Sequence, residues 1–532
     1  MMSSISRRRF LKGLGVGALT ISSMGSSAFA ATNSERHGGA LKIATNSTLP
    51  TLDAHASTLV VVQDTIPWIQ EGLGALDANY KPRPMLAESW APNEDNSVWT
   101  INLREGVSFH NGKEMTATDV KASLDRWTEF SPTKARLDSL REITIEDPYT
   151  LKLHFDGPFG ILPLVLSTPG TPIVIMPEEQ TKTTIGKIYE PIGTGPYKFK
   201  ERSPNEFLKL ERFDNYWQMD NPLPYDNSAY AGHKIAYTDE VHLYPVPEVS
   251  TRLAGLRTGQ YHIIYQVPVG EFSSLEQSAN QQPVIVKPGR MHLLFLNKRQ
   301  GIMQNRYLRR AVKLAQSVEP ILKAITEGKE EFYRIDPGLF YQEMIWHSVV
   351  DRGLYNVGSV EEAKQWMEQA NYGGEKIRFM ATKDYPTMYR ASLVIKQQLE
   401  QAGLNIDYQI YDWPTLTTRR AKPELWDIFI TYSTNMYDPY MWSKHIGAGE
   451  YPGWSESFEM KHAYQVLGKE SDFDIRYRQA EILQFHNAIE GVMQKIGDDF
   501  YLRAQQKGVN NPNAGSQRFV ALNTWLEQDL RS

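Results

Sequence analysis

Alternating apolar and polar positions predict strands along much of this chain. The first runs over residues 39–45 and another over residues 98–103. Residues 406–410 alternate as in a half-buried strand, which stops before Pro414 because proline cannot donate a ladder hydrogen bond. Residues 426–432 (WDIFITY) are mostly apolar, which is typical of a buried strand.

Helical spacing is clearest after Thr116. Thr116 and Asp119 have the form of a capping box, and the apolar residues that follow recur at helical intervals. Helices are also expected around residues 60–73, 363–370 and 391–402, and the last two alternate with strands. The second half of the chain therefore has an α/β pattern.

The middle of the chain contains a long β-rich stretch over residues 284–297, interrupted by Pro288-Gly289. It divides a strand-rich first half from the α/β second half. The chain has 532 residues, which predicts roughly three domain-sized units, and its composition is that of an ordinary globular protein. A chain that passes from one compact unit into another in this way favours hinge closure on a ligand.

The ends of the strands predict a binding cleft, because ligands of open α/β sheets bind beyond strand ends. One wall would come from the loops after residues 410 and 432, and the other from the polar loop after the first strand. The candidate ligand-binding residues are Asn46, Ser47, Thr48, Trp413, Tyr432, Asn435 and Met436. The alternative interpretation is that Trp413 and Tyr432 are ordinary core aromatics.

No catalytic, metal or cofactor site is expected. The sequence contains no phosphate-binding loop, zinc-protease motif, nucleophile elbow or EF-hand loop. Gly193-Thr194-Gly195 is followed by Pro196 and predicts a turn. No histidine pair has metal-ligand spacing, and His110 and His445 are expected to be surface or satisfied residues.

Residues 1–30 have the features of an export signal. The segment SRRRFLK at residues 6–12 resembles the twin-arginine signal, and residues 28–30 (AFA) form a small-x-small cleavage pattern. Loss of the four cations in this segment changes the formal charge from −5 to −9, which argues against a nucleic-acid partner. The absence of cysteine removes a lipid anchor, and no later window is apolar enough to span a membrane. A soluble periplasmic protein is expected.

Seven motifs follow one another along the chain. They are LAESW, the alternating strand at residues 98–103, LREGVSFHNGKEMTATDVKASLDR, PIGTGPY, NYW, RLAGLRTG and LFLN. In this order they resemble the extracellular solute-binding proteins of the oligopeptide and dipeptide type (family 5), which feed ABC importers. The resemblance runs from about Leu41 to Pro439.

The resemblance implies an α/β, two-lobed periplasmic binding protein fold (type II, Venus flytrap) with an extra subdomain in the first lobe. Lobe I would span residues 39–288, with the subdomain at about 78–185, and lobe II residues 289–491. Residues 492–532 would return to lobe I. The resemblance also implies a monomer that binds a peptide or peptide-like solute without catalysis and delivers it to the importer's permease subunits in the inner membrane.

One departure from the family pattern bears on the ligand. The family loop reads W-x-x-D, and its Asp pairs with the α-ammonium of a peptide, whereas this chain has Tyr432 and Asn435. An amide cannot form that charge-assisted hydrogen bond. Asp438 either substitutes for the carboxylate or fixes the turn beside Pro439. A sugar conjugate, an opine or an oligosaccharide therefore stays open as cargo, and an exported hydrolase is the remote alternative.

Overall fold

The computed structural model describes residues 36–170, 172–219, 230–434, 437–441, 449, 451–455 and 457–531. The predicted export signal and the predicted site residues Asn435 and Met436 lie outside these ranges. The strands of the main sheet are β1 (Ala40–Thr45), β8 (Tyr197–Ser203), β9 (Phe207–Arg212), β10 (Glu240–Pro245), β11 (Ile263–Val267), β12 (Gln281–Leu296), β13 (Tyr333–Arg334), β14 (Ile377–Ala381), β15 (Ile406–Ile410), β16 (Ile428–Ser433) and β17 (Met493–Gln506).

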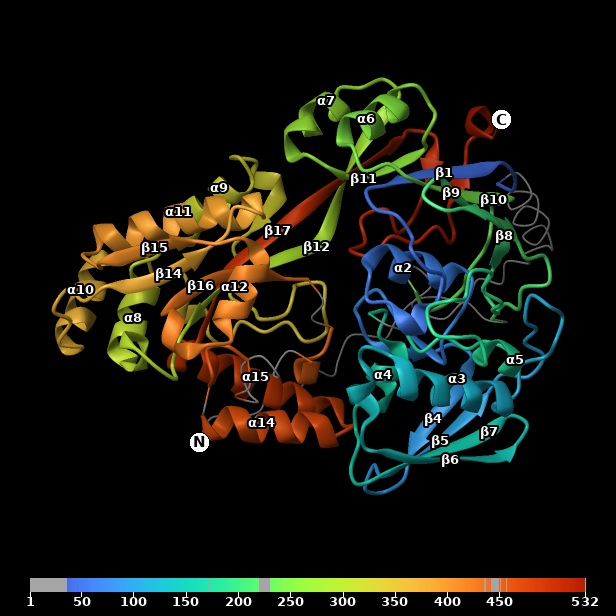
Figure 1. Cartoon of the computed structure of the whole chain (residues 1–532), viewed down its shortest axis with the longest axis horizontal. Coiled ribbons are helices and arrows are strands. Elements are labelled where there is room, and N and C mark those ends of the chain that lie inside the picture. Colours follow the sequence, from blue (N-terminus) through green and yellow to red (C-terminus); the bar gives the residue numbers. More distant parts are fainter. Residues whose placement is uncertain are drawn as a thin grey trace, which may run out of the picture.

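The main sheet runs through both halves of the molecule. Its order is β15-β14-β16-β12-β17-β11-β1-β10-β9-β8, with β13 beside β17. Figure 1 shows two lobes, which β12 and β17 join. The first lobe contains β1 and β8–β10, and the second lobe contains β14–β16. The two-lobed α/β architecture is as predicted, while the exact boundaries at residues 288 and 492 stay a prediction.

The first lobe is built on β1, which lies parallel to both β10 and β11. The predicted alternation is confirmed, because Leu41 and Ile43 are fully buried in the core of this lobe. The helix expected over residues 60–73 is shorter than predicted. Helix α2 (Val60–Thr65) gives way to a 3-10 turn that contains Pro67.

A separate four-stranded sheet covers one end of the first lobe. Its order is β4 (Ala87–Pro92), β5 (Val98–Leu103), β7 (Thr150–Phe155) and β6 (Leu140–Asp147). Helix α3 (Ala117–Phe130) packs on it and begins with the predicted capping box, in which Thr116 and Asp119 satisfy each other's backbone amides. The apolar residues at helical spacing after Thr116 are buried against this sheet.

The junction consists of two long antiparallel strands, β12 and β17. The register shifts between Val286 and Arg290, where Gly289 approaches the neighbouring strand closely. A Cβ at Gly289 would lie 2.0 Å from the carbonyl oxygen of Asp499, so only glycine fits there. On its other side β17 pairs with β11, which ties the junction to the first lobe.

The second lobe has a doubly wound arrangement. Figure 1 shows α9 (Val318–Ile325) and α11 (Pro386–Gln401) on one side of β14 and β15, and α8 (Arg306–Leu314) and α10 (Val360–Gln369) on the other. The predicted strands at residues 406–410 and 426–432 are both present. β15 is the edge strand of the sheet, and Ile406 and Tyr408 pack against the core of the second lobe while staying partly exposed.

The remaining elements complete the two lobes. They are α4 (Leu162–Ser167), α5 (Glu178–Thr181), α6 (Val249–Arg257), α7 (Phe272–Glu276), α12 (Trp413–Arg420), α14 (Phe458–Lys469), α15 (Phe473–Glu490), β2 (Gly74–Leu76), β3 (Pro82–Pro84), β18 (Val509–Asn510) and β19 (Trp525–Leu526). Within the described ranges, no helix has both the length and the apolar composition needed to cross a membrane.

Candidate ligand-binding cleft

An open cleft lies where the two lobes meet the junction strands. Its volume is about 460 Å³, within the range typical of small-solute sites. Its lining comes from the loop after β1, from α2, from the ends of β11 and β16, from β12 and β17, and from residues 517–518 of the C-terminal segment. Both lobes and the junction therefore contribute to one site.

The first-lobe wall follows from the direction of β1. Asn46, Ser47 and Thr48 come directly after the carboxyl end of this strand, where open sheets bind their ligands. Asn46 donates a hydrogen bond from Nδ2 to Oε1 of Gln266, at 3.1 Å, and Thr45 Oγ1 donates to the carbonyl of Ser47, at 2.9 Å. These bonds hold the loop while the Ser47 and Thr48 side chains stay at least partly exposed.

An exposed apolar edge borders this wall. Leu59 and Val60 line the cleft at the start of α2, yet they are 48% and 56% exposed. Ligand sites commonly combine such apolar area with a few polar groups that fix orientation. The edge therefore offers contact area to the apolar part of a solute.

The second-lobe wall is aromatic. Tyr432, near the end of β16, lines the cleft, and its ring packs edge-on against Tyr385 with centroids 5.7 Å apart. Tyr385 in turn packs edge-on against Trp413, with centroids 5.2 Å apart. Trp413 thus acts behind Tyr385 and does not itself line the cleft formed by the described residues.

Trp413 also lies in a different element from the one expected. It begins helix α12, whose N-cap is Asp412 and whose first turn contains Pro414. Proline does end the strand. It is equally suited to the first turn of a helix, because the amide groups of that turn have no hydrogen-bond partner within the helix, so the amide hydrogen that proline lacks is not needed there. The loop expected after the strand is therefore replaced by a helix start.

Of the predicted site residues, the cleft brings together Asn46, Ser47, Thr48 and Tyr432. Trp413 supports this wall from behind, and Asn435 and Met436 lie outside the described residues. The role of all seven as ligand contacts stays a prediction.

Arginines are the part of the cleft that sequence reasoning missed. Arg290, on β12, binds the carboxylate of Asp499 through Nε and Nη2, and Nε2 of His292 lies 2.8 Å from the same carboxylate. Burial favours protonation of Asp499, but the charges of Arg290 and His292 outweigh it, so the pKa of Asp499 lies below its usual range. Asp499 is therefore a carboxylate that is fully engaged behind the cleft wall.

Two further guanidinium groups line the cleft. Arg518 contacts Asp64 Oδ1 at 3.2 Å and Gln63 Oε1 at 2.8 Å. Arg503 donates to the backbone carbonyls of Ala514, Ser516 and Gln517 at 2.8 to 3.0 Å. For Arg290 and Arg503 the signal in the sequence is a charged residue among buried strand residues, since a buried arginine needs partners. Arg518 lies outside the strands and gives no such signal.

The remaining candidates have structural roles. Asp438 is buried and accepts hydrogen bonds from Arg476 Nη2, at 2.7 Å, and from the Tyr440 amide, so it fixes the turn. His110 Nε2 lies 2.9 Å from the carbonyl of Gly195, and burial lowers the pKa of this histidine to about 4, which keeps it neutral. His110 is thus a satisfied residue, as predicted.

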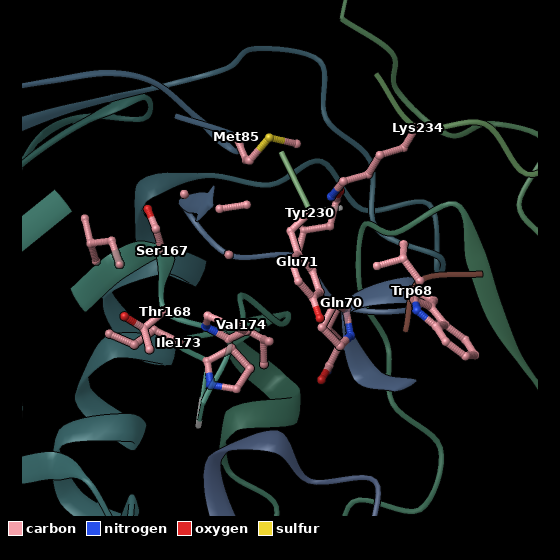
Figure 2. Close-up of a pocket in the computed structure, with 18 of the residues that line it drawn as sticks. Trp68, Gln70, Glu71, Met85, Ser167, Thr168, Ile173, Val174, Tyr230 and Lys234 are labelled. Atoms are coloured by element: carbon pink, nitrogen blue, oxygen red, sulfur yellow. The ribbon is translucent and has the colours of Figure 1, made fainter. Parts of the chain in front are cut away.

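A second cavity, in the first lobe, is shown in Figure 2. Lys234 Nζ lies 2.6 Å from Glu71, whose carboxylate also accepts from Tyr216, Trp217 and Thr194 at 3.0 Å. The cavity measures about 40 Å³, which is room for water molecules only. Glu71 is therefore the centre of a structural network. The described residues also contain no cluster of His, Asp and Glu side chains that could hold a metal ion.

Two lobes joined by a strand pair, with a solute-sized cleft between them, define a solute-binding protein. The chain belongs to the bacterial extracellular solute-binding proteins, family 5, whose middle region matches residues 81–450. The resemblance predicted from the motifs is confirmed.

Individual relatives agree with this assignment. The chain is 27% identical over 395 residues to a Sinorhizobium fredii protein named "Probable peptide ABC transporter periplasmic-binding protein y4tO", covering 72% of this chain and 73% of that protein. It is 25% identical over 368 residues to the glutathione-binding protein GsiB of Salmonella paratyphi A, covering 68% and 67%. The structure of the periplasmic binding protein DppA of Helicobacter pylori, in complex with the peptide STSA, has the same fold, with a TM-score of 0.71, 20% identity, and coverage of 94% of this chain and 100% of that one.

Proposed function

We propose that this protein is the periplasmic solute-binding component of an ABC importer and that it captures a peptide or peptide-like solute. The observation that carries the proposal is the cleft of about 460 Å³, to which both lobes and the junction contribute residues. The names of the Sinorhizobium and Salmonella relatives support a peptide as cargo, since glutathione is itself a tripeptide.

Binding would proceed by closure of the lobes without covalent chemistry. Asn46, Ser47 and Thr48 would orient polar groups of the solute from the first lobe. Tyr432 would supply aromatic contact area from the second lobe, with Trp413 behind it. Asn435 and Met436, which follow Tyr432 closely in the sequence, are proposed as further contacts. A solute that contacts both lobes only in the closed state shifts the population toward that state. The closed form would then deliver the solute, unchanged, to the permease.

The expected location of the protein is the periplasm. The twin-arginine segment within residues 1–30 would direct export of the folded chain, and cleavage after Ala30 would release it into the periplasm as a monomer. Because the sequence has no cysteine, a lipid anchor is not part of the proposal.

Titration of the mature chain, residues 31–532, tests the proposal. A library of di- to pentapeptides, with sugar conjugates, opines and oligosaccharides as a parallel set, is screened by intrinsic tryptophan and tyrosine fluorescence. We expect saturable binding of a subset of peptides with Kd in the micromolar range or below, and mass spectrometry should recover each peptide intact. Binding only by the sugar or opine set would replace the peptide as cargo. Turnover of a bound compound would contradict the binding role.

A further inference from the structure

We propose that this cleft selects solutes carrying an anionic group, a carboxylate or a phosphate, which it binds through the guanidinium groups of Arg503 and Arg290. The inference rests on the proposed function, because it assigns a chemical class to the solute captured there. It follows from the charges that line the cleft, from their partners and from their burial.

Arg503 is a largely buried guanidinium group that lines the cleft. Arg503 is only 7% exposed, and its guanidinium group donates hydrogen bonds to the backbone carbonyls of residues 514, 516 and 517. Among the ion pairs of the described ranges, none includes Arg503. Its guanidinium carbon lies 5.3 Å from the ring centre of Tyr265 and 5.4 Å from that of Phe519, so these rings shield it from water on their side.

Arg290 lies in the same wall and is more accessible. Its side chain is 22% exposed, and Asp499 occupies Nε and Nη2. Its guanidinium carbon lies 5.0 Å from the ring centre of Tyr501 and 5.4 Å from that of Tyr432. Asp499, Tyr501 and Arg503 are spaced by two residues along β17, so their side chains share one face of the sheet. Tyr501 and Arg503 line the cleft from this face, and Asp499 lies behind Arg290.

The charge balance of the cleft favours an anion. The lining residues include three guanidinium groups, on Arg290, Arg503 and Arg518, but Asp64 is their only carboxylate among the described residues. Asp64 already contacts Arg518, and Asp499 behind the wall contacts Arg290 and His292. Burial raises the pKa of Asp64 above its usual range, against the effect of Arg518 and Arg503, which weakens the only negative charge among the described lining residues.

Neighbouring charges do not remove this surplus. On the far side of β17, Asp498 pairs with Lys495 and with Arg334, and Arg334 also pairs with Glu343, so these groups compensate one another. A buried cation without a counter-charge is costly, and an incoming anion would relieve that cost. The planar guanidinium group also matches the geometry of carboxylate and phosphate oxygens.

The described part of the cleft offers no free carboxylate to a cationic solute. Each carboxylate at the described part of the cleft already has an arginine partner. An acidic solute is therefore better accommodated than a basic one.

Paired ligands test this inference on the wild-type mature chain, without any variant. The tightest peptide from the library is compared with its forms in which each carboxyl group, in turn and together, is converted to an amide. A form with phosphoserine in place of the acidic residue separates phosphate from carboxylate. We expect amidation of one carboxyl group to weaken binding at least tenfold. Amides that bind as tightly as acids would overturn the inference and leave the proposed function intact.

The residue assignment is tested by Arg503→Gln. We expect at least a tenfold loss of affinity for the acidic peptide and less than a twofold change for its amide, with Arg503→Lys retaining part of the affinity. Arg141→Gln is the matched control, because Arg141 is an exposed residue whose partner is the exposed Asp156. Equal weakening of acid and amide by Arg503→Gln would contradict the assignment. If no peptide, sugar conjugate, opine or oligosaccharide of the library binds wild-type protein, the proposed function itself fails.

Discussion

Asp499 shows how a single carboxylate holds the cleft wall in place. It is 2% exposed and engages Arg290 and His292, two groups that are more than 200 residues away in sequence. Removal of one partner from a buried ion pair is far more costly than removal of the whole pair, because the remaining charge stays desolvated. This makes Asp499 the residue on which the geometry of Arg290 depends.

The Asp499→Asn variant should therefore be destabilised by roughly 3 to 5 kcal/mol, measured by urea unfolding at pH 7. Because the pKa of Asp499 is lower in the folded protein than its usual 3.8, its stabilisation is present above that pH and is lost as the pH falls through the folded value. The difference between variant and wild type should then shrink in acid. Asp156→Asn, which removes the exposed partner of Arg141, should cost only about 0 to 1 kcal/mol. Similar losses in both variants would refute this account of Asp499.

At the residue scale, the sequence predicted local interactions better than distant ones. The capping box of Thr116 and Asp119 spans four residues and is present as expected. Asn46 and Tyr432 were placed at one cleft from the strand ends alone. The pairing of Arg290 with Asp499 spans 209 residues, so no periodicity within a window of sequence could indicate it.

At the scale of elements, the junction depends on one place where the backbones of β12 and β17 lie unusually close together. Gly289 on β12 has no room for a Cβ, because backbone atoms of Asp499 and Phe500 would lie 2.0 to 2.9 Å from it. These contacts are with backbone atoms and not with a flexible side chain that could move aside. A side chain at position 289 would therefore force β12 and β17 apart.

Gly289→Ala should therefore lower the free energy of unfolding by roughly 1 to 3 kcal/mol or more, and it should weaken ligand binding because Arg290 is the next residue. Gly157→Ala is the control, since a Cβ at Gly157 meets nothing within 4 Å. Urea unfolding and fluorescence titration of both variants provide the measurement. Two variants that match wild type in stability would show that the strands can adjust.

The sequence predicted an element correctly where the element's own residue pattern determines its structure. It predicted less well where the neighbouring strands or residues determine it. Residues 98–103 alternate and form β5 with its alternate residues buried. Residues 406–410 also alternate, but β15 has a neighbour on one side only, so its side chains remain partly exposed. At Asp412-Trp413-Pro414 the proline was correctly interpreted as the end of a strand. The following helix was missed, because Asp412 and Pro414 also form a standard helix start.

At the scale of the whole molecule, the two lobes are expected to move relative to each other about β12 and β17. The cleft is open, and it is lined from both lobes, so a bound solute gains its second set of contacts only on closure. Small-angle scattering should show a smaller radius of gyration when the tightest peptide is added at 100 times its Kd. At that ratio, ligand linkage should also stabilise the fold by about 2.7 kcal/mol. Unchanged dimensions together with clear binding would mean that the lobes are rigid and that the solute enters a preformed site.

The position of β17 also constrains how the chain is made. This strand lies in the middle of the main sheet, between β12 and β11, yet the ribosome synthesises it after every other strand of that sheet. The nascent polypeptide consequently exposes two unpaired edges until the last segment emerges, and such late, long-range pairing is slow. The main sheet can therefore be completed only after residues near the far end of the chain from β1 have been synthesised.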